Sequence, residues 1–379
     1  MSNRILLVGG GSGGHVYPLI AVAEELKNQA GQKGVELEVL FLGEGGFFKR
    51  AVKEKGYAFK NITSGKLRRY FSLLTLLDIF KLPVGFVQSL WHLYWFMPDV
   101  VFAKGGYASV LPALVAKLYM IPLYVHESDS IPGLANRFLG RTATKIFISF
   151  QSSAAHFDAS RTILTGNPVR RELLTGDRNE AAALYNLSSS KKTIFVYGGS
   201  QGAQKINNIV LDSLVMMAGK GFQMIHQCGS AQYDAVKKSV EKITKEGEGS
   251  YGEAVIQNYR LEPFLDLEKA RAAYALADII ISRAGASNIF EIAAVGKPAI
   301  IIPITNSSGN HQLNNAIAFS KSGAVLLEEQ NLTPNILISQ IEYLLKPENY
   351  ETVGQKIKNF ATPDAAQIIA DTLLSGLRV

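Results

Sequence analysis

Residues 5–15 read Ile-Leu-Leu-Val-Gly-Gly-Gly-Ser-Gly-Gly-His, and this stretch decides the fold class. Four apolar residues suit a strand buried on both faces, and the glycines after them suit a tight turn into a helix. Residues 194–204 repeat the plan as Ile-Phe-Val-Tyr-Gly-Gly-Ser-Gln-Gly-Ala-Gln. A strand, a glycine loop and a helix in each half predict two Rossmann-like units.

Short apolar runs alternate with helical patterns along the rest of the chain, which predicts βαβ units and parallel sheets. The expected strands of the first series are 4–8, 35–42, 99–103, 121–126 and 145–149. Those of the second series are 193–197, 222–227, 254–258, 278–282 and 298–303. A chain of 379 residues also exceeds one ordinary core. We therefore predict an α/β protein with two doubly wound parallel-sheet domains.

The segment Gly166-Asn167-Pro168 separates the two series, because a residue before proline avoids the helical region. We expect a first domain over residues 1–165 and a second over residues 166–349. The single cysteine, Cys228, excludes a disulfide within the chain and favours a reducing compartment.

Positive charge is concentrated in the first half. Residues 1–170 hold 19 Lys and Arg against 11 Asp and Glu, a net charge of +8, whereas residues 171–379 hold 20 against 21. This asymmetry indicates an anionic partner, which could be nucleic acid, a membrane surface or a phosphorylated substrate. The most apolar stretch, 71–97, contains Asp78 and Lys81, so we expect no transmembrane helix. We expect no signal peptide either, since no charged segment and cleavage site precede the first strand.

Each glycine loop is a candidate anion site, because the helix after it presents unpaired backbone N–H groups and a partial positive charge. Gly9, Gly11 and Gly14 match G-x-G-x-x-G, but the acidic residue expected about 20 positions later in a dinucleotide fold is missing. The mismatch argues against a nicotinamide-dependent oxidoreductase. The alternative is a tight turn that binds nothing.

Three further segments follow expected strands, where open α/β sheets bind their ligands. In the segment 282–291, Glu291 could form a capping box with Asn288 or accept hydrogen bonds from sugar or ribose hydroxyls. The segments 104–107 and 126–137 are rich in polar residues and glycine. The alternative for both is turn chemistry within a satisfied polar network.

Seven segments carry a resemblance to a known family: GGGSGGHVYPLIAVAEEL (9–26), KGGY (104–107), HESDSIPGLANR (126–137), GNPVR (166–170), GGSQGAQ (198–204), SRAGASNIFEIAAVGKP (282–298) and HQLNNA (311–316). Their order and combination resemble the MurG family of inverting GT-B glycosyltransferases. The resemblance implies two Rossmann-like domains facing a cleft, and a C-terminal helix, about 350–379, that packs back on the first domain.

The resemblance also implies a reaction in peptidoglycan synthesis and cell-wall biogenesis. N-acetylglucosamine (GlcNAc) would pass from UDP-GlcNAc to the 4-hydroxyl of the N-acetylmuramoyl-pentapeptide on undecaprenyl diphosphate, converting lipid I to lipid II. The implied partners are UDP-GlcNAc, lipid I and the anionic surface of the inner membrane, on whose cytoplasmic face the enzyme would be peripheral. No nucleic acid and no cofactor are expected.

Carried over residue by residue, the resemblance assigns two candidate catalytic residues, His15 and Glu127, and places Tyr107 beside Glu127 on the acceptor side. The base could be His15, whose ordinary pKa suits neutral pH, although a loop histidine bonded to backbone is an equal alternative. The implied UDP-GlcNAc contacts are Ser12, Gly13, Gly14, Asp129, Arg170, Ser200, Leu265, Ala286, Ser287, Asn288, Ile289, Phe290, Glu291 and Gln312. Many relatives have Asn where this chain has Asp129, and an ionised carboxylate can only accept hydrogen bonds.

Two more expectations concern metal and membrane. No Asp-x-Asp occurs, so we expect no protein-held metal ion. Lys66, Arg68 and Arg69 precede an apolar stretch that contains both tryptophans, which suits a helix docked on an anionic membrane; a core-facing helix is the alternative. The competing functions are a sugar-nucleotide epimerase, an oxidoreductase and a noncatalytic sugar-nucleotide or lipid-binding module.

Overall fold

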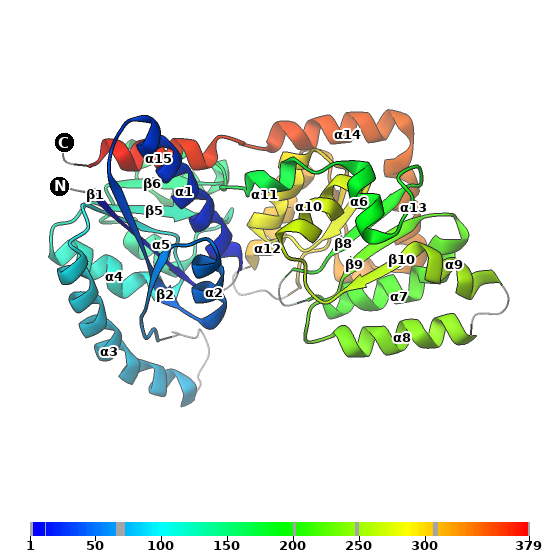
Figure 1. The fold of residues 1–379 in the computed structure, drawn as a ribbon, viewed down its shortest axis with the longest axis horizontal. Coiled ribbons are helices and arrows are strands. Elements are labelled where there is room, and N and C mark those ends of the chain that lie inside the picture. Colours follow the sequence, from blue (N-terminus) through cyan, green and yellow to red (C-terminus); the bar gives the residue numbers. More distant parts are fainter. Residues whose placement is uncertain are drawn as a thin grey trace. The chain divides into compact units, whose positions relative to one another are not determined.

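A computed structural model describes residues 3–11, 13–65, 73–199, 202–246, 250–305 and 310–377. The chain forms two compact units: unit 1 comprises Met1–Val169 and Thr362–Val379, and unit 2 comprises Arg170–Ala361. Each unit is one parallel sheet with helices on both faces (Figure 1). This is the α/β fold with two parallel-sheet domains that the sequence predicts.

The sheet of unit 1 has seven strands in the order β3-β2-β1-β4-β5-β6-β7, and every neighbouring pair is parallel. Its strands are β1 (Asn3–Gly10), β2 (Leu37–Glu44), β3 (Ala58–Asn61), β4 (Val100–Ala103), β5 (Leu123–Glu127), β6 (Lys145–Ile148) and β7 (Thr162–Leu164). The strand order reverses direction between β1 and β4. Open α/β sheets bind ligands at such a switch point, beyond the carboxyl ends of the strands.

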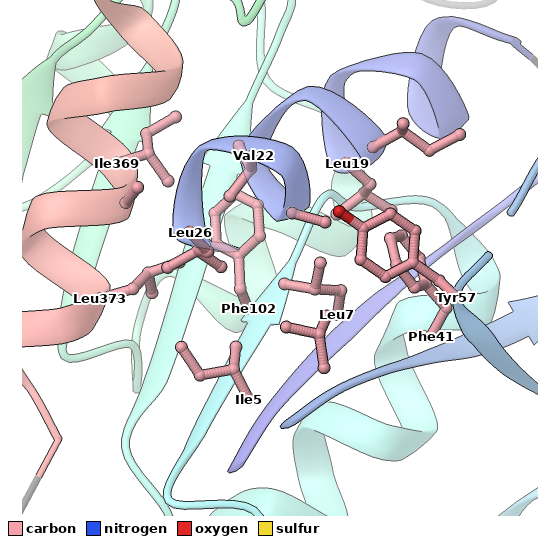
Figure 2. Packing of buried hydrophobic residues seen from close by; sticks show 14 of the residues in the cluster. Ile5, Leu7, Leu19, Val22, Leu26, Phe41, Tyr57, Phe102, Ile369 and Leu373 are labelled. Carbon is pink, nitrogen blue, oxygen red and sulfur yellow. The ribbon is translucent and has the colours of Figure 1, made fainter. Parts of the chain in front are cut away.

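Two separate cores cover the faces of this sheet. Its helices are α1 (Gly13–Gln32), α2 (Gly46–Glu54), α3 (Leu73–Phe96), α4 (Tyr107–Leu118), α5 (Leu134–Leu139) and α15 (Ala365–Ser375). On one face, Val22 and Leu26 of α1 lie with Phe102 of β4 and Ile369 of α15 (Figure 2). On the other face, α3, α4 and α5 contribute to a second cluster that includes Leu93. Apolar positions three and four residues apart build each helix's inner face.

The sheet of unit 2 has six strands in the order β10-β9-β8-β11-β12-β13, again all parallel. Its strands are β8 (Thr193–Tyr197), β9 (Gln223–Gln227), β10 (Tyr259–Glu262), β11 (Ile279–Ser282), β12 (Ala299–Ile301) and β13 (Val325–Leu326). Its α-helices are α6 (Arg178–Tyr185), α7 (Gln204–Gly219), α8 (Tyr233–Glu246), α9 (Ser250–Asn258), α10 (Leu267–Leu276), α11 (Ala286–Val295), α12 (His311–Ser320), α13 (Pro334–Leu345) and α14 (Pro347–Phe360). The switch point lies between β8 and β11.

One predicted strand is wrong. Residues 254–258 form the end of helix α9, and the strand β10 begins directly after it at Tyr259. A short apolar run fits a buried strand and a helix turn equally well, so periodicity alone could not separate them. The strands β3, β7 and β13 are short and were not predicted.

The C-terminal segment contains two helices. α14 belongs to unit 2, whereas α15 follows the crossing at Ala361–Thr362 and packs on α1 in unit 1. Only residues 362–379 of the expected range 350–379 therefore belong to unit 1. The boundary between the units lies at Val169–Arg170, close to the one expected from Pro168.

Candidate active site

The switch point of unit 1 brings the first glycine loop next to the segment after β4. A Cβ atom at Gly9 would lie 2.5 Å from Leu19 Cδ1, and one at Gly10 would lie 3.0 Å from Ala108 Cβ. Glycine is therefore required there, because α1 and α4 both approach the backbone closely. Gly13 and Gly14 begin α1, and Tyr107 begins α4 without a side-chain cap at Gly106.

His15 lies in the first turn of α1, at this switch point. A Cβ atom on Gly106 would be 3.9 Å from His15 Nε2, so the ring lies beside the turn after β4. Within the described residues, the buried Nδ1 of His15 has no hydrogen-bond partner. Burial and the Lys104 ammonium lower the pKa of His15, against opposing effects of Asp129 and the Lys104 carbonyl. A neutral imidazole suits a general base, and the backbone hydrogen bond to Lys104 equally fits a loop histidine bonded to backbone.

Glu127 ends β5 and organises the loop that follows. Its Oε1 accepts a hydrogen bond from Asp129 N at 2.8 Å, and its Oε2 accepts from Gly133 N and Asn136 Nδ2, both at 3.0 Å. Burial, with the nearby Asp129 carboxylate, raises the pKa of Glu127 to about 7. Asp129 is close enough to His15 to affect its pKa. Glu127 holds the loop after β5, a role additional to the predicted catalytic one.

Lys104 directly follows β4 and is buried at the switch point of unit 1. It was not among the functional residues predicted from the sequence. Its Nζ lies 2.5 Å from His126 Nδ1 and 2.8 Å from Asn167 Oδ1, and it also donates to Ser128 Oγ. Burial lowers its pKa to about 7, although Glu127 and Asp129 act in the opposite direction. The available signal was a lysine directly after a fully apolar strand at the switch point.

The second glycine loop and the start of α11 lie at the switch point of unit 2. A Cβ atom at Gly199 would be 4.0 Å from Asn288 Nδ2, so the loop after β8 lies beside α11. Both α7 and α11 begin without a side-chain cap, at Ala203 and Gly285. Asp266 caps α10, by contrast. The partial positive charge at two neighbouring helix starts suits an anion such as a diphosphate.

Arg170 and Glu291, which the resemblance places on the donor, form a buried ion pair with each other. Arg170 Nη2 and Nε lie 2.9 and 3.0 Å from Glu291 Oε1, and Tyr274 donates to Glu291 Oε2 at 3.1 Å. The capping alternative for Glu291 is wrong, because the N-cap of α11 is Gly285 and Asn288 bonds to Ser282 Oγ instead. Glu291 is thus rigidly held, with its position set by residues far away in the sequence.

The other predicted donor residues differ in accessibility. Ala286 is buried in the first turn of α11, and Ser287 and Asn288 are partly exposed there. Ile289 and Phe290 point into the core, so only their backbone is available to a ligand. Leu265 is also buried, and Gln312, on α12, accepts from Ile304 N at 3.2 Å. The predicted residues Ser12, Lys66, Arg68, Arg69 and Ser200 lie outside the described residues.

A second buried ion pair, which the sequence did not predict, connects the loops after β11, β12 and β13 at the switch point of unit 2. Arg283 Nη1 lies 2.7 Å from Glu329 Oε1, and Lys205 Nζ lies 3.1 Å from Glu329 Oε2. Thr305 also donates to Glu329. Burial alone would raise the pKa of Glu329, but hydrogen bonds from these three residues outweigh it and lower the pKa to about 2. The carboxylate is therefore ionised at neutral pH and fixes the loops after β11 and β12.

Solved structures with the same fold include a MurG and a UDP-GlcNAc 2-epimerase. The chain superposes on MurG from Acinetobacter baumannii with a TM-score of 0.71 at 24% identity, covering 98% of this chain and 99% of that one. It superposes on a UDP-GlcNAc 2-epimerase from Neisseria meningitidis, bound to UDP-GlcNAc, with a TM-score of 0.68 at 17% identity, covering 98% and 100%. At these identities the likeness establishes the fold, which is that of the GT-B glycosyltransferases.

Sequence relatives are closer and span the full chain. A UDP-N-acetylglucosamine–N-acetylmuramyl-(pentapeptide) pyrophosphoryl-undecaprenol N-acetylglucosamine transferase from Flavobacterium psychrophilum is 35% identical over 98% of this chain and 97% of the relative. The enzyme of the same name from Treponema denticola is 36% identical with the same coverage. Residues 5–148 match the glycosyltransferase family 28 N-terminal domain, and residues 193–369 match its C-terminal domain. The chain therefore belongs to glycosyltransferase family 28 and, within it, to the MurG group.

Proposed function

We propose that this chain transfers GlcNAc from UDP-GlcNAc to the 4-hydroxyl of the muramoyl sugar of lipid I and so forms lipid II for peptidoglycan synthesis. The observation that carries the proposal is the full-length match, at about 35% identity, to transferases named for this reaction. In this proposal the switch point of unit 1, with the first glycine loop and the start of α1, is the acceptor edge. The switch point of unit 2, with the second glycine loop and the starts of α7 and α11, is the donor edge.

The acceptor edge supports base catalysis by His15. His15 takes the proton of the acceptor hydroxyl as that oxygen attacks the anomeric carbon, and UDP leaves from the opposite face. This displacement passes through an oxocarbenium-like transition state and inverts the anomeric centre. A neutral His15 is required at the start, which agrees with the lowered pKa.

The donor edge supports departure of UDP. Negative charge grows on the diphosphate as the glycosidic bond breaks, and the uncapped starts of α7 and α11 offer fixed N–H groups to it. Glu291 bonds the ribose hydroxyls, Gln312 bonds the GlcNAc hydroxyls, and Arg170 contacts the donor. Removing one preorganised hydrogen-bond donor to such a developing negative charge typically raises the activation barrier by about 3–4 kcal/mol.

An epimerase is the second candidate, since UDP-GlcNAc 2-epimerases share this fold. The two functions differ in their need for an acceptor. We expect UDP release from UDP-GlcNAc only when a lipid I analogue is present. An altered sugar or UDP from donor alone would favour the epimerase, and donor binding without turnover would indicate a binding module.

Transfer should persist in excess EDTA. The two helix-start sites neutralise the diphosphate in this proposal, and the chain has no Asp-x-Asp to hold a divalent ion beside it. The measurement is the rate of UDP release with and without EDTA at saturating donor and acceptor. Complete loss of transfer that only Mg²⁺ or Mn²⁺ restores would contradict the expectation.

We also propose that unit 1 docks on the anionic cytoplasmic leaflet of the inner membrane through α3. Phe80, Val84, Val87, Trp91 and Trp95 recur at helical spacing on its outer face and are exposed, with Trp91 at 62% and Trp95 at 64%. The inner face packs on the core through Leu93, so α3 is both a core helix and an exposed apolar surface. Such a surface on one helix suits an interfacial contact. None of the described helices could cross a bilayer.

Two variants test this docking in liposome co-sedimentation. Changing both Trp91 and Trp95 to Ser should abolish most binding to anionic liposomes, because aromatic side chains insert at headgroup depth. Changing Lys66, Arg68 and Arg69 to Ser should weaken binding at low salt by about 1 kcal/mol per residue. The matched control changes Tyr251 and Ile256, exposed apolar residues of unit 2, to Ser. Wild-type binding by the first two variants would refute the docking surface.

A further inference from the structure

Donors from the segments after β8, β11 and β12 converge on the carboxylate of Glu329. Arg283 Nη1 lies 2.7 Å from Glu329 Oε1, and Lys205 Nζ lies 3.1 Å from Glu329 Oε2. Thr305 Oγ1 also donates to Oε2. A threonine hydroxyl has a single hydrogen. Thr305 is therefore anchored to this carboxylate, whose side chain is only 5% exposed.

Arg283 also holds the peptide group between Pro303 and Ile304. Its Nη1 lies 3.1 Å from the carbonyl oxygen of Ile302 and 3.3 Å from that of Pro303. In a trans peptide group, the C=O and the N–H point in opposite directions. Because the oxygen of Pro303 faces Arg283, the N–H of Ile304 points away from Arg283.

This N–H bonds to the side chain of Gln312. Ile304 N donates to Gln312 Oε1 at 3.2 Å. A backbone N–H can only donate, so the amide oxygen of Gln312 must face it and Nε2 must point away. Within the described ranges, Gln312 Nε2 makes no hydrogen bond, and the residue is partly exposed. Gln312 thus presents N–H donors at the carboxyl edge of the sheet.

Hydrogen bonds, rather than the apolar core, fix the segment that orients Gln312. Ile304 is 40% exposed and Thr305 is exposed as well. Glu329 acts on both sides of Ile304, through Arg283 on the preceding carbonyl group and through Thr305 on the following residue. Loss of this carboxylate would release both supports together.

We propose that Glu329 is a positioning residue for the donor sugar. Through Arg283, Thr305 and the N–H of Ile304, it fixes the Gln312 amide so that Nε2 donates to an oxygen of the transferred GlcNAc. The inference rests on the proposed function, because it takes Gln312 as a contact of that sugar. It adds a residue that acts through Gln312 without touching the substrate.

Calorimetric titration of the full chain with UDP-GlcNAc and with UDP tests this role. Thr305→Val removes the hydroxyl that bonds to Glu329 and changes the size of an exposed side chain very little. It should weaken UDP-GlcNAc binding by about two- to tenfold, the usual effect of one hydrogen bond. The affinity for UDP should stay at the wild-type value, because UDP lacks the sugar. Glu329→Gln should show the same selective loss, and Thr305→Ser, which keeps the hydroxyl, should behave as wild type.

A double-variant cycle shows whether the effect passes through Gln312. Gln312→Met should weaken the binding of UDP-GlcNAc but not that of UDP. Adding Thr305→Val to it should cause no further loss, because the amide that Thr305 helps to position is gone. Glu342→Gln is the matched control: it makes the same charge change at an exposed glutamate of unit 2, which pairs with Lys220, and should leave both affinities unchanged.

Several results would overturn the role of Glu329. They are equal losses of UDP and UDP-GlcNAc affinity in Thr305→Val and Glu329→Gln, wild-type UDP-GlcNAc affinity in either variant or in Gln312→Met, and a full further loss when Thr305→Val is added to Gln312→Met. A wild-type protein that binds UDP-GlcNAc but does not transfer GlcNAc to a lipid I analogue would instead refute the proposed function.

Discussion

Replacing His15 by Asn should lower kcat by about 10²–10⁴-fold, the usual contribution of a positioned general base. Asn is similar in size but cannot take up a proton at neutral pH. The affinity for UDP-GlcNAc should change much less than kcat, because the proposed role of the His15 side chain is to take the proton of the acceptor hydroxyl. Steady-state kinetics and calorimetric titration with UDP-GlcNAc measure the two quantities separately.

His156→Asn is the matched control, since His156 is an exposed histidine of the same unit. It should transfer at the wild-type rate. A His15→Asn variant with wild-type kcat would remove His15 as the base and would leave Glu127, buried with a raised pKa, as the remaining predicted candidate.

Breaking the Arg170–Glu291 pair should have the largest effect on stability. Arg170→Ala or Glu291→Ala leaves the other charge buried without its partner, which costs about 3–5 kcal/mol of unfolding free energy. The family resemblance predicts that each variant binds UDP-GlcNAc more weakly without unfolding, and the buried ion pair adds a stability cost to that expectation. Replacing both residues together, by Met and Leu, should recover most of the lost stability, because no unpaired charge remains.

This double variant separates the structural role from the donor-binding one. It should fold, as measured by urea unfolding, yet bind UDP-GlcNAc about tenfold or more weakly, since a hydrogen bond to a charged group contributes about 1.5–3 kcal/mol. Substituting Lys220 and Glu342 singly by Ala gives the matched control; this pair is exposed and should contribute at most about 1 kcal/mol. Wild-type affinity in the stable double variant would show that the pair serves the fold alone.

Local patterns predicted much of the fold. The two glycine loops located β1 and β8, and with them the start of both sheets. Continuous apolar runs located most other strands because parallel strands are buried on both faces. The same signal failed at residues 254–258, where a helix end has an equally apolar composition. The edge strands β3, β7 and β13 are only partly buried, so they carry little of that signal.

The candidate site was predictable only at the level of segments. The strand pattern indicated the segments that hold His15 and Glu127, because open α/β sheets bind ligands beyond their strand ends, and the family resemblance singled out the two residues within them. Contacts between distant residues of the site were not predicted: Lys104 bonds to Asn167, 63 positions away, and Arg170 bonds to Glu291, 121 positions away. Pairing over such separations depends on strand order and register, which the sequence of one chain does not reveal.

The central claim, acceptor-dependent transfer of GlcNAc, is tested most directly by the mass of the acceptor. A lipid I analogue incubated with UDP-GlcNAc and this protein should gain one N-acetylhexosaminyl residue, with an equal amount of UDP released. No UDP should be released when the analogue is omitted. An acceptor of unchanged mass, or release of UDP or an epimerised sugar from UDP-GlcNAc alone, would contradict it.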